Sequence, residues 1–364
     1  MSEFATRIVA WQREHGRHDL PWQNTRDPYV IWLSEIMLQQ TQVATVIPYF
    51  KRFLARFPDI ESLAAADENE VLRLWSGLGY YSRGRNLHHA ATLIMARHSG
   101  RFPESRPDIE ALPGIGRSTA AAIAGFAFGA RAAILDGNVK RVLARHFVIE
   151  GHPGERDVEQ VLWGLAESLL PPKDGENYIQ GLMDLGATVC TSRSPRCEAC
   201  PIAGSCRALE QNRVQELPTP KTKKQVPTRD TIMLVLMHGD EVLLQKRPAI
   251  GIWGGLWSFP EYSELNEGLI LAQRLFGCEV AATENLSPLK HSFTHFHLRI
   301  APVLARVERR APRAAQPGVV WSQVSEALND ALPTPAKKIL RALQPSTATN
   351  QTALFEEALQ DFQS

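Results

Sequence analysis

The chain has 364 residues and a formal net charge of only +1, with 44% hydrophobic and 22% charged residues. Such a length and composition indicate a globular protein of roughly two to three domains with sizeable hydrophobic cores. No apolar run is long enough to span a membrane, and the first residues form an amphipathic segment unlike a signal peptide. We therefore expect no membrane association and a cytoplasmic location, and the charge alone does not require a polyanionic partner.

The first 207 residues consist of successive helical patterns with few strand signals. In the segment 29–48, apolar residues including Leu33, Ile36 and Met37 recur at helical spacing and would share one buried face. Similar patterns predict further helices over 67–74, 118–129, 139–147, 158–169 and 177–189. Residues 1–207 are therefore predicted to form an all-α domain.

Glu35 lies within the first of these segments, in the sequence WLSEIMLQQTQV. A carboxyl group among apolar neighbours would be desolvated and its pKa raised, as a general acid requires. The alternative is an exposed glutamate on the polar side of the helix, and the periodicity does not decide between the two.

A Gly-x-Gly turn at Gly114 and Gly116 opens directly into a helix of small residues. Glycine can adopt a positive φ and has no Cβ, so another backbone can approach closely, and a helix N-terminus suits a phosphate. The same segment, 112–141, ends with Asp136 in an Asp-Gly-Asn turn. The pattern predicts a site that binds a nucleic-acid backbone beside a carboxylate. The alternative is an ordinary loop whose helix is capped by Ser118 or Thr119.

Four of the five cysteines follow the spacing C-x6-C-x2-C-x5-C, at Cys190, Cys197, Cys200 and Cys206. Four thiolates so close in sequence can hold a [4Fe–4S] cluster or a zinc ion. Zinc sites more often show two C-x2-C pairs, whereas this segment has one. The spacing therefore predicts a metal site and does not by itself establish iron.

After residue 207 the composition and the hydrophobic pattern of the sequence change. Residues 208–228 are rich in proline and basic residues and are predicted to be an extended linker. The stretch TIMLVLMHGDEVLLQKR then predicts two strands joined by a His-Gly-Asp turn. Further strands are predicted in FTHFHLRIAPVLARV and GVVWSQ, and helices over 265–276 and 337–343. Residues 229–343 should thus form an α+β domain, followed by a flexible tail over 344–364.

The order of these motifs resembles the helix-hairpin-helix DNA glycosylases, and among them the adenine DNA glycosylases of the MutY type. The matching motifs are SEIMLQQTQV, GLGYYSRGRN, LPGIGRSTA, LDGNVKRV and the four cysteines. The resemblance implies a six-helix barrel plus an iron–sulfur cluster domain, with the helix-hairpin-helix at about 110–130 and a [4Fe–4S] loop over 190–206. It also implies hydrolysis of the N-glycosidic bond of adenine mispaired with 8-oxoguanine or guanine in double-stranded DNA.

The resemblance assigns roles to individual residues. Glu35 would protonate adenine N7, Asp136 would act as nucleophile or cation stabiliser, and Asn138 would orient Asp136 or the sugar. Glycosidic cleavage uses two carboxyls in different environments. Contacts to DNA are implied for Gln39, Gln40, Leu78, Tyr80, Pro113, Gly114, Gly116, Arg117, Ser118 and Lys140. For Leu78 and Tyr80, the ordinary alternative is core packing around a glycine-rich turn.

Ser118 bears on the type of reaction. In the endonuclease III branch of the family, a lysine at this position attacks C1′ and makes the enzyme a lyase. Serine here implies a monofunctional glycosylase that uses water. The other functions considered are an endonuclease III-like pyrimidine glycosylase/lyase and a catalytically silent lesion-binding protein.

The C-terminal domain resembles the MutT-like (Nudix-fold) module of adenine glycosylases. Its helix GLILAQRLFG lacks the glutamates that hold magnesium in Nudix hydrolases, so we expect a lesion-reading module without pyrophosphohydrolase activity. The segment HSFTHFH places Phe293, Thr294 and His295 at the loop that contacts 8-oxoguanine. In the tail, Gln351, Leu354 and Phe355 resemble a peptide that docks on the replication sliding clamp, the alternative being an ordinary amphipathic helix. We expect a monomer associated with the bacterial nucleoid.

Overall fold

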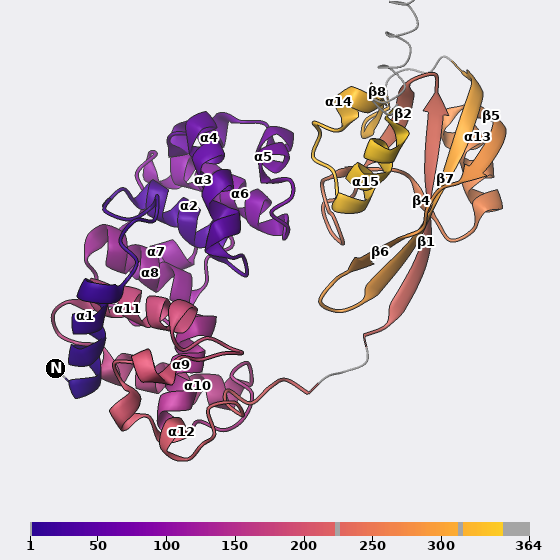
Figure 1. Cartoon of the computed structure of the whole chain (residues 1–364). Coiled ribbons are helices and arrows are strands. Elements are labelled where there is room, and N and C mark those ends of the chain that lie inside the picture. Colours follow the sequence, from indigo (N-terminus) through magenta and orange to yellow (C-terminus); the bar gives the residue numbers. More distant parts are fainter. Residues whose placement is uncertain (1, 223–225, 312–315, 345–364) are drawn as a thin grey trace, which may run out of the picture. The chain divides into compact units, whose positions relative to one another are not determined.

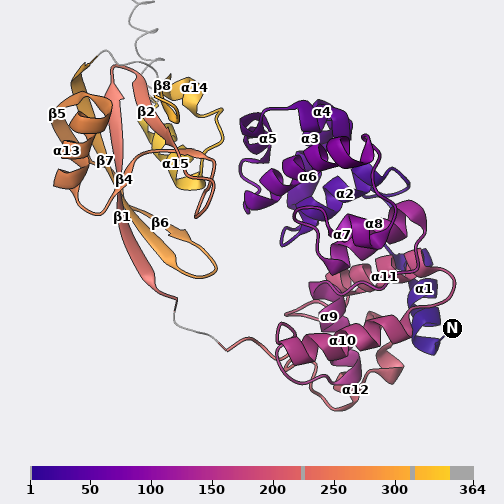
Figure 2. The same cartoon turned by 180° about the vertical axis from the view of Figure 1, so that it is seen from behind.

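The computed structural model describes residues 2–222, 226–311 and 316–344. They fall into two compact units, one made of residues 2–66 and 82–222 and the other of residues 67–81 and the described residues from 226 onward. The described part of the first unit is helical, and the second contains a mixed β-sheet (Figure 1, Figure 2). The predicted fold class, a helical domain followed by an α+β domain, is confirmed. Among the described residues, no helix is long and apolar enough to cross a membrane.

The helices of the first unit follow one another with short connections. They are α1 (Glu3–His15), α2 (Pro28–Leu38), α3 (Val43–Arg56), α4 (Ile60–Ala65), α6 (Ser82–His98), α7 (Arg106–Glu110), α8 (Arg117–Phe128), α9 (Gly137–Phe147), α10 (Arg156–Leu169), α11 (Gly175–Thr188), the 3₁₀ turns η1 (Cys197–Ala199) and η2 (Ala203–Ser205), and α12 (Arg207–Glu210). Helix α5 (Glu68–Trp75) belongs to the second unit.

The single helix predicted over 29–48 is wrong, because the structure divides this segment into α2 and α3. Helix α2 begins where the Asp27 side chain accepts the Tyr29 N–H at 2.9 Å, and it ends at Leu38. The break follows because Gln40 adopts a left-handed backbone with φ of 56°. Apolar periodicity continued across this break and could not reveal it.

The predicted linker over 208–228 also differs from the structure. Leu217 is buried, and its carbonyl accepts a hydrogen bond from Arg145 Nε at 2.8 Å. Residues up to 222 therefore belong to the helical unit. Helix α12 and an ion pair between Arg213 and Glu150 also attach this stretch to the helical unit, and composition alone did not show this. The predicted boundary at 207 further missed that residues 67–81 group with the second unit.

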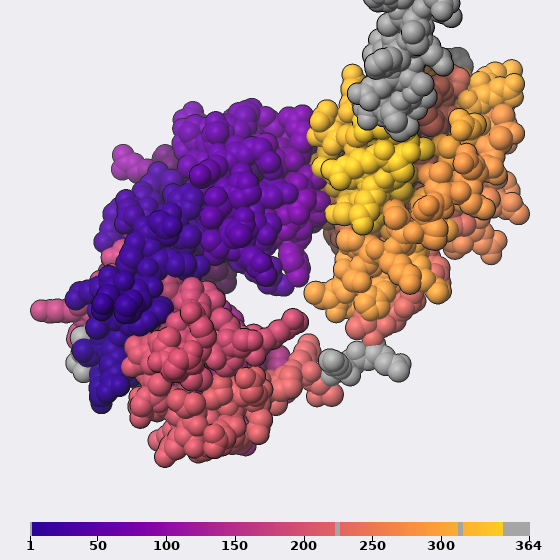
Figure 3. All heavy atoms as spheres, viewed as in Figure 1, coloured from indigo at the N-terminus to yellow at the C-terminus, as the bar shows by residue number. Residues whose placement is uncertain are grey.

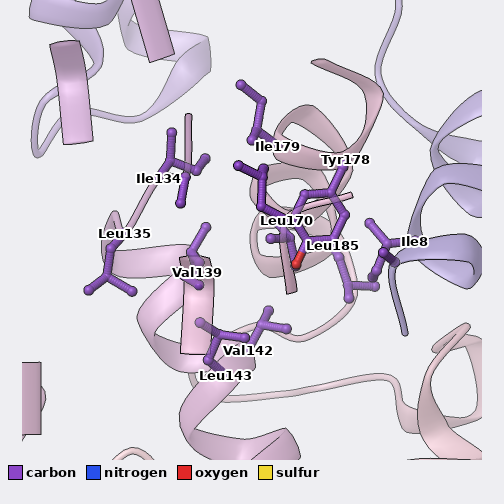
Figure 4. Packing of buried hydrophobic residues seen from close by; sticks show 14 of the residues in the cluster. Ile8, Ile134, Leu135, Val139, Val142, Leu143, Leu170, Tyr178, Ile179 and Leu185 are labelled. Carbon is purple, nitrogen blue, oxygen red and sulfur yellow. The ribbon is translucent and has the colours of Figure 1, made fainter. Parts of the chain in front are cut away.

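The core of the helical unit surrounds the segment that carries Asp136. Buried side chains from α1, α9, α11 and the segment before α9 meet there (Figure 4), and they include Ile8, Ile134, Leu135, Val139, Val142, Leu143, Tyr178, Ile179 and Leu185. Helix α1, indigo in Figure 3, packs on α11 and exposes its polar side. Each such buried side chain contributes about 1.5–3 kcal/mol of burial free energy. Because Leu135 and Val139 are both held in this core, the intervening turn has little freedom to move.

The sheet of the second unit has the order β3-β2-β1-β7-β5, with β4 paired to β1, β6 to β7 and β8 to β2. Its elements are β1 (Thr228–His238), β2 (Glu241–Lys246), β3 (Trp257–Ser258), β4 (Glu261–Tyr262), α13 (Leu265–Phe276), β5 (Cys278–Asn285), β6 (Leu289–Ser292), β7 (His297–Arg310), β8 (Val319–Gln323), α14 (Val324–Ala327) and α15 (Thr334–Leu343). Strands β1 and β7 are parallel, and the other pairs are antiparallel.

Alternate residues of β1 pack on opposite faces of this sheet, as a strand period of two requires. Leu234 and Leu236 belong to the core that contains α13, while Met233 and Val235 belong to the core that contains α14 and α15. The predicted pair of strands joined at His-Gly-Asp is confirmed as β1 and β2, and the helix predicted over 265–276 is α13.

Candidate active site and DNA-binding surface

A cavity of about 230 Å³ lies beside α2 in the helical unit. Its lining combines apolar and polar side chains, a composition suited to a small ring with hydrogen-bonding edges. The lining includes Leu20, Trp22, Ile31, Glu35, Glu176 and Gln180.

Glu35 is half-buried in the wall of this cavity, and its neighbours Ser34 and Ile36 on α2 are buried. Burial raises the pKa of Glu35 to about 8, and the negative charge of Asp136 adds to the rise. The carboxyl group is therefore largely protonated at neutral pH and can donate a proton. The alternative of an exposed, polar-face glutamate does not match this position.

Asp136 forms the N-cap of α9. Its Oδ1 accepts the Val139 N–H at 2.8 Å, and its Oδ2 accepts from Asn138 Nδ2 at 3.3 Å. Burial raises the pKa of Asp136, and the bond from Val139 and the charge of Arg141 oppose this rise. Although Glu35 and Asp136 are far apart in sequence, the fold brings them within electrostatic reach of each other.

Arg141 connects the Asp136 turn to the cysteine segment. Its Nη2 donates to Asn138 Oδ1 at 2.8 Å and to the Gly186 carbonyl at 2.7 Å, and its Nε donates to the Cys190 carbonyl at 2.8 Å. Asn138 is thus oriented from one side by Arg141 while it donates to Asp136. No sequence pattern singled out Arg141 for this role, because its partners lie in other elements.

The hairpin consists of α7, a turn and α8. Gly114 has a φ of 79°, and a Cβ added there would lie 2.9 Å from Asn86 Cβ. Gly116 is the exposed N-cap of α8 and forms no side-chain capping bond. The alternative in which Ser118 or Thr119 caps the helix is therefore wrong. No capping side chain covers the first N–H groups of α8, and such groups can bind an anion.

Ser118 and Gln39 join this hairpin to the rest of the site. Ser118 Oγ accepts the Leu135 N–H at 2.9 Å, directly before Asp136. Gln39 Nε2 donates to the Gly114 carbonyl at 3.3 Å. Pro113 is half-buried in the turn between α7 and α8. Hairpin, Asp136 turn and the end of α2 are thus connected by hydrogen bonds.

The remaining predicted DNA contacts differ in exposure. Gln40 is exposed, and Arg117 and Lys140 are half-buried in the first turns of α8 and α9. Tyr80 has 45% of its surface exposed and a φ of 48°, whereas Leu78 is 6% exposed. In this structure Leu78 therefore packs inward, as the core-packing alternative expects.

Arg83 is a site residue that the sequence patterns did not identify. Its buried guanidinium donates to the carbonyls of Ile36 and Met37 in the last turn of α2 and to that of Gln39, directly after the helix. These carbonyls have no partner within the helix, and a cation stabilises the negative end of the helix dipole. Arg83 thereby fixes the C-terminal end of the helix that carries Glu35.

The sequence patterns also did not identify Arg17 and Asp184 as site residues. Arg17, which lines the cavity, donates from Nε to Asp184 Oδ1 at 2.6 Å and from its backbone N–H to Oδ2 at 3.0 Å. Gln180 Nε2 donates to the same carboxylate at 2.9 Å. Asp184 is fully buried within an apolar stretch of α11. A lone aspartate in an apolar helix was the available signal, since a buried charge needs partners.

Cys190, Cys197, Cys200 and Cys206 all line one largely apolar cavity beside α9. Burial raises the pKa of the Cys200 thiol to about 12, and Arg145 Nη1 lies 3.3 Å from Cys190 Sγ. No three acidic, histidine or cysteine side chains in the described part of the chain lie close enough to share a single metal ion. Four thiols around one cavity are the donor set that a [4Fe–4S] cluster requires.

In the second unit, Phe293, Thr294 and His295 form the tip between β6 and β7. Phe293 stacks on the buried Phe296 with ring centroids 4.6 Å apart, and its N–H donates to the Phe296 carbonyl at 2.9 Å. Thr294 and His295 are exposed. Phe293 thus anchors the tip, which presents the other two side chains. Gln351, Leu354 and Phe355 lie outside the described residues.

Comparison with known proteins identifies the family to which these sites belong. Family models match the HhH-GPD superfamily of base excision DNA repair proteins over residues 33–168, the iron-sulfur binding domain of endonuclease III over 190–206 and the NUDIX domain over 231–342. The adenine DNA glycosylase of Buchnera aphidicola subsp. Acyrthosiphon pisum is 37% identical over 93% of this chain and 96% of its own. The human adenine DNA glycosylase is 33% identical over 94% of this chain and 74% of its own.

Two solved structures resemble the helical unit. A thermostable thymine-DNA glycosylase has a TM-score of 0.51 and 32% identity, covering 57% of this chain and 95% of its own. An endonuclease III–DNA complex, at a TM-score of 0.50 and 21% identity over 57% of this chain and 94% of its own, shows the same fold. With full-length relatives of one activity, a base excision repair domain, an iron–sulfur binding domain and a Nudix domain in this order, the chain belongs to the adenine DNA glycosylase family, whose members remove adenine from DNA.

Proposed function

We propose that the enzyme excises adenine paired with 8-oxoguanine, and also with guanine, and leaves an abasic site in an uncut strand. The observation that carries the proposal is the pairing of a protonated Glu35 in a cavity wall with Asp136 nearby. Acid and carboxylate in different environments are the groups that glycosidic cleavage needs.

In the proposed reaction, adenine leaves the base stack and enters the cavity, because its glycosidic bond is unreachable inside a duplex. The ring lies in the cavity lined by Trp22, Glu176 and Gln180. Glu35 gives its proton to N7, and the C1′–N9 bond breaks with its electron pair going to the base. The Asp136 carboxylate stabilises the positive sugar. Water then adds to C1′ and loses a proton, and Glu35 is reprotonated for the next cycle.

Water completes the reaction because no amine occupies the hairpin position of Ser118, whose hydroxyl is bonded to the backbone before Asp136. A duplex with adenine opposite 8-oxoguanine tests this. Strand breaks should appear only after alkali treatment, and Asp136→Asn and Glu35→Gln should each abolish them while binding is retained. Breaks without alkali would favour the lyase alternative, and unchanged excision by Asp136→Asn would overturn the mechanism.

We assign the four cysteines as ligands of the [4Fe–4S] cluster. When bound to these four thiolates, the cluster would cross-link the 190–206 loop. Around it, Arg145 donates to the carbonyls of Thr191 and Ser192 and to that of Leu217. The chain's own residues thus tie the loop to α9, the helix that begins at Asp136.

We assign recognition of 8-oxoguanine to Thr294 and His295 at the exposed tip. In the double variant Thr294→Ala/His295→Ala, the preference for adenine opposite 8-oxoguanine over adenine opposite guanine should fall by about thirtyfold, since two hydrogen bonds of roughly 1 kcal/mol each are removed. Thr283→Ala, at an exposed position of β5, is the control and should keep the preference. An unchanged ratio in the double variant would remove this assignment.

We also propose that the segment with Gln351, Leu354 and Phe355 docks on a replication sliding clamp, with the enzyme acting as a monomer at the bacterial nucleoid. A glycosylase held there would meet the newly made strand, which carries the misplaced adenine. A pull-down with the clamp should lose the enzyme when residues 344–364 are removed, and equal capture of both forms would exclude the proposal.

A further inference from the structure

Helix α10 presents a stripe of three residues on one face: Glu159, Trp163 and Glu167. Their spacing of four residues places them one helical turn apart, so the side chains lie above one another. We refer to these three residues as the α10 stripe. The helix packs against α9, the helix that follows Asp136.

The stripe contacts both cations that the proposed function assigns to DNA phosphates. Lys140 Nζ lies 2.6 Å from Glu159 Oε1, and Arg117 Nη2 lies 2.5 Å from Glu167 Oε1. The Arg117 guanidinium also stacks over the Trp163 ring, at 3.8 Å from its centroid. Two cations from different helices, α8 and α9, are therefore held by one helix that itself carries no proposed DNA contact.

We propose that the α10 stripe occupies these cations in the free enzyme and thereby lowers its affinity for DNA. The inference rests on the proposed phosphate contacts of Arg117 and Lys140. To bind a phosphate, each cation must give up its carboxylate or share it, and the carboxylate then lies near the incoming negative charge. Glu159 and Glu167 thus compete with the DNA backbone for the same two cations.

The geometry indicates that Glu159 and Glu167 compete with DNA phosphates for the two cations and do not help the cations to bind them. The ion pairs are partly exposed, with 41% of the Glu159 side chain and 53% of the Glu167 side chain accessible, so phosphates and water can reach them. Trp163 holds the plane of the Arg117 guanidinium independently of Glu167. Removing the carboxylate therefore leaves the cation positioned but unoccupied. Partly exposed pairs of this kind are weak enough to exchange, and each should weaken DNA binding by about two- to fivefold.

The experiment compares full-length, cluster-containing enzyme with its Glu159→Gln/Glu167→Gln variant. Binding to a short undamaged duplex is measured by fluorescence anisotropy at several salt concentrations. The variant should bind about four- to 25-fold more tightly at low salt, with the gain shrinking as salt screens the charges. Partial unfolding would instead weaken binding, so a structural effect cannot imitate this result.

Two controls identify the cause. Glu3→Gln/Glu150→Gln removes the same two charges from ion pairs with Arg7 and Arg213 and should change affinity by less than twofold. In an Arg117→Met/Lys140→Met background, the glutamine substitutions on α10 should give no gain. An unchanged or weaker affinity of the α10 variant, an equal gain in the control, or a gain that persists without the cations would each overturn the proposal.

The same measurements separate this inference from the proposed function. No base is removed from an undamaged duplex, so the binding measurement does not depend on the chemistry. It would stand even if the proposed 8-oxoguanine preference or the proposed attack by water were wrong. If Arg117→Met/Lys140→Met binds DNA as tightly as the wild type, the phosphate contacts fail, and the role of the α10 stripe fails with them.

Discussion

Glu35 and Asp136 have raised pKa values for the same reason, burial, yet they differ in what opposes it. Asp136 accepts bonds from Val139 and Asn138 and lies near the charge of Arg141, all of which stabilise its carboxylate form. For Glu35 the charge of Asp136 raises the pKa further. Both pKa values are raised, but only Asp136 has neighbours that stabilise its carboxylate form, and this difference suits the proposed division of roles.

The pH profile of excision tests this division. Because the acid must be protonated and its pKa is about 8, the single-turnover rate should be level near pH 7 and fall as the pH rises through about 8. Rates measured from pH 4 to 9.5 on adenine opposite 8-oxoguanine would show where the decline occurs. A profile that falls near pH 5, where an ordinary glutamate titrates, would contradict the role of Glu35.

Glu35 should also lower the free energy of unfolding at high pH. Its pKa rises from 4.5 to about 8 on folding, so between these values the folded state binds more protons and the free energy of unfolding falls as the pH rises. Each pKa unit corresponds to about 1.4 kcal/mol, so Glu35→Gln should stabilise the protein at pH 8 by roughly 1–4 kcal/mol while it abolishes excision. Denaturant midpoints at pH 5 and pH 8 measure this. An equal shift at both pH values would contradict it.

At the scale of elements, α11 determines the position of the first turn of α9. A Cβ added at Gly186 would lie 2.5 Å from Asn138 Cβ and 3.1 Å from the Asn138 carbonyl oxygen. Gly186→Ala should push this turn away, destabilise the protein by about 1–3 kcal/mol and lower excision at least tenfold. The matched control is Gly164→Ala on α10, where a Cβ meets nothing within 4 Å. That variant should keep full activity and gain up to about 1 kcal/mol.

For Gly186→Ala, single-turnover rates and thermal unfolding are the measurements. Full activity in this variant would show that the contact with Asn138 does not position Asp136. Loss of activity in Gly164→Ala as well would show that any change in helix composition has the same effect.

At the scale of the whole molecule, the cysteine segment joins parts that are distant in the chain. Arg141 and Arg145 on α9 bond the carbonyls of Cys190 and Leu217, so loss of the cluster should loosen α9 as well as the loop. Cys200→Ser should lose bound iron and DNA affinity while most helical circular dichroism remains. Cys278→Ala, which alters the buried free cysteine of the other unit, should retain iron. Equal iron contents in the two variants would contradict the assignment.

Some features could be predicted because they depend on local spacing. The amphipathic periods of α8 to α11, the alternation of β1 and β2 and the spacing of the cysteines are properties of neighbouring residues. Other features could not be predicted. The break between α2 and α3 depends on a left-handed Gln40 and on Arg83, which comes from another helix. The burial of Leu217 depends on a partner, Arg145, far away in the chain.

The sequence by itself indicated the class of the protein, the order of its domains, the four-cysteine motif and the two candidate carboxyls, because each depends on residue type and short-range spacing. Only the tertiary structure decided that Asp136 lies close enough to raise the pKa of Glu35, that Arg141 bonds Asn138 to the cysteine segment, and that α10 holds Arg117 and Lys140. The physical reason is that pKa values and ion pairs depend on burial and on distances across the fold, which spacing along the chain does not fix.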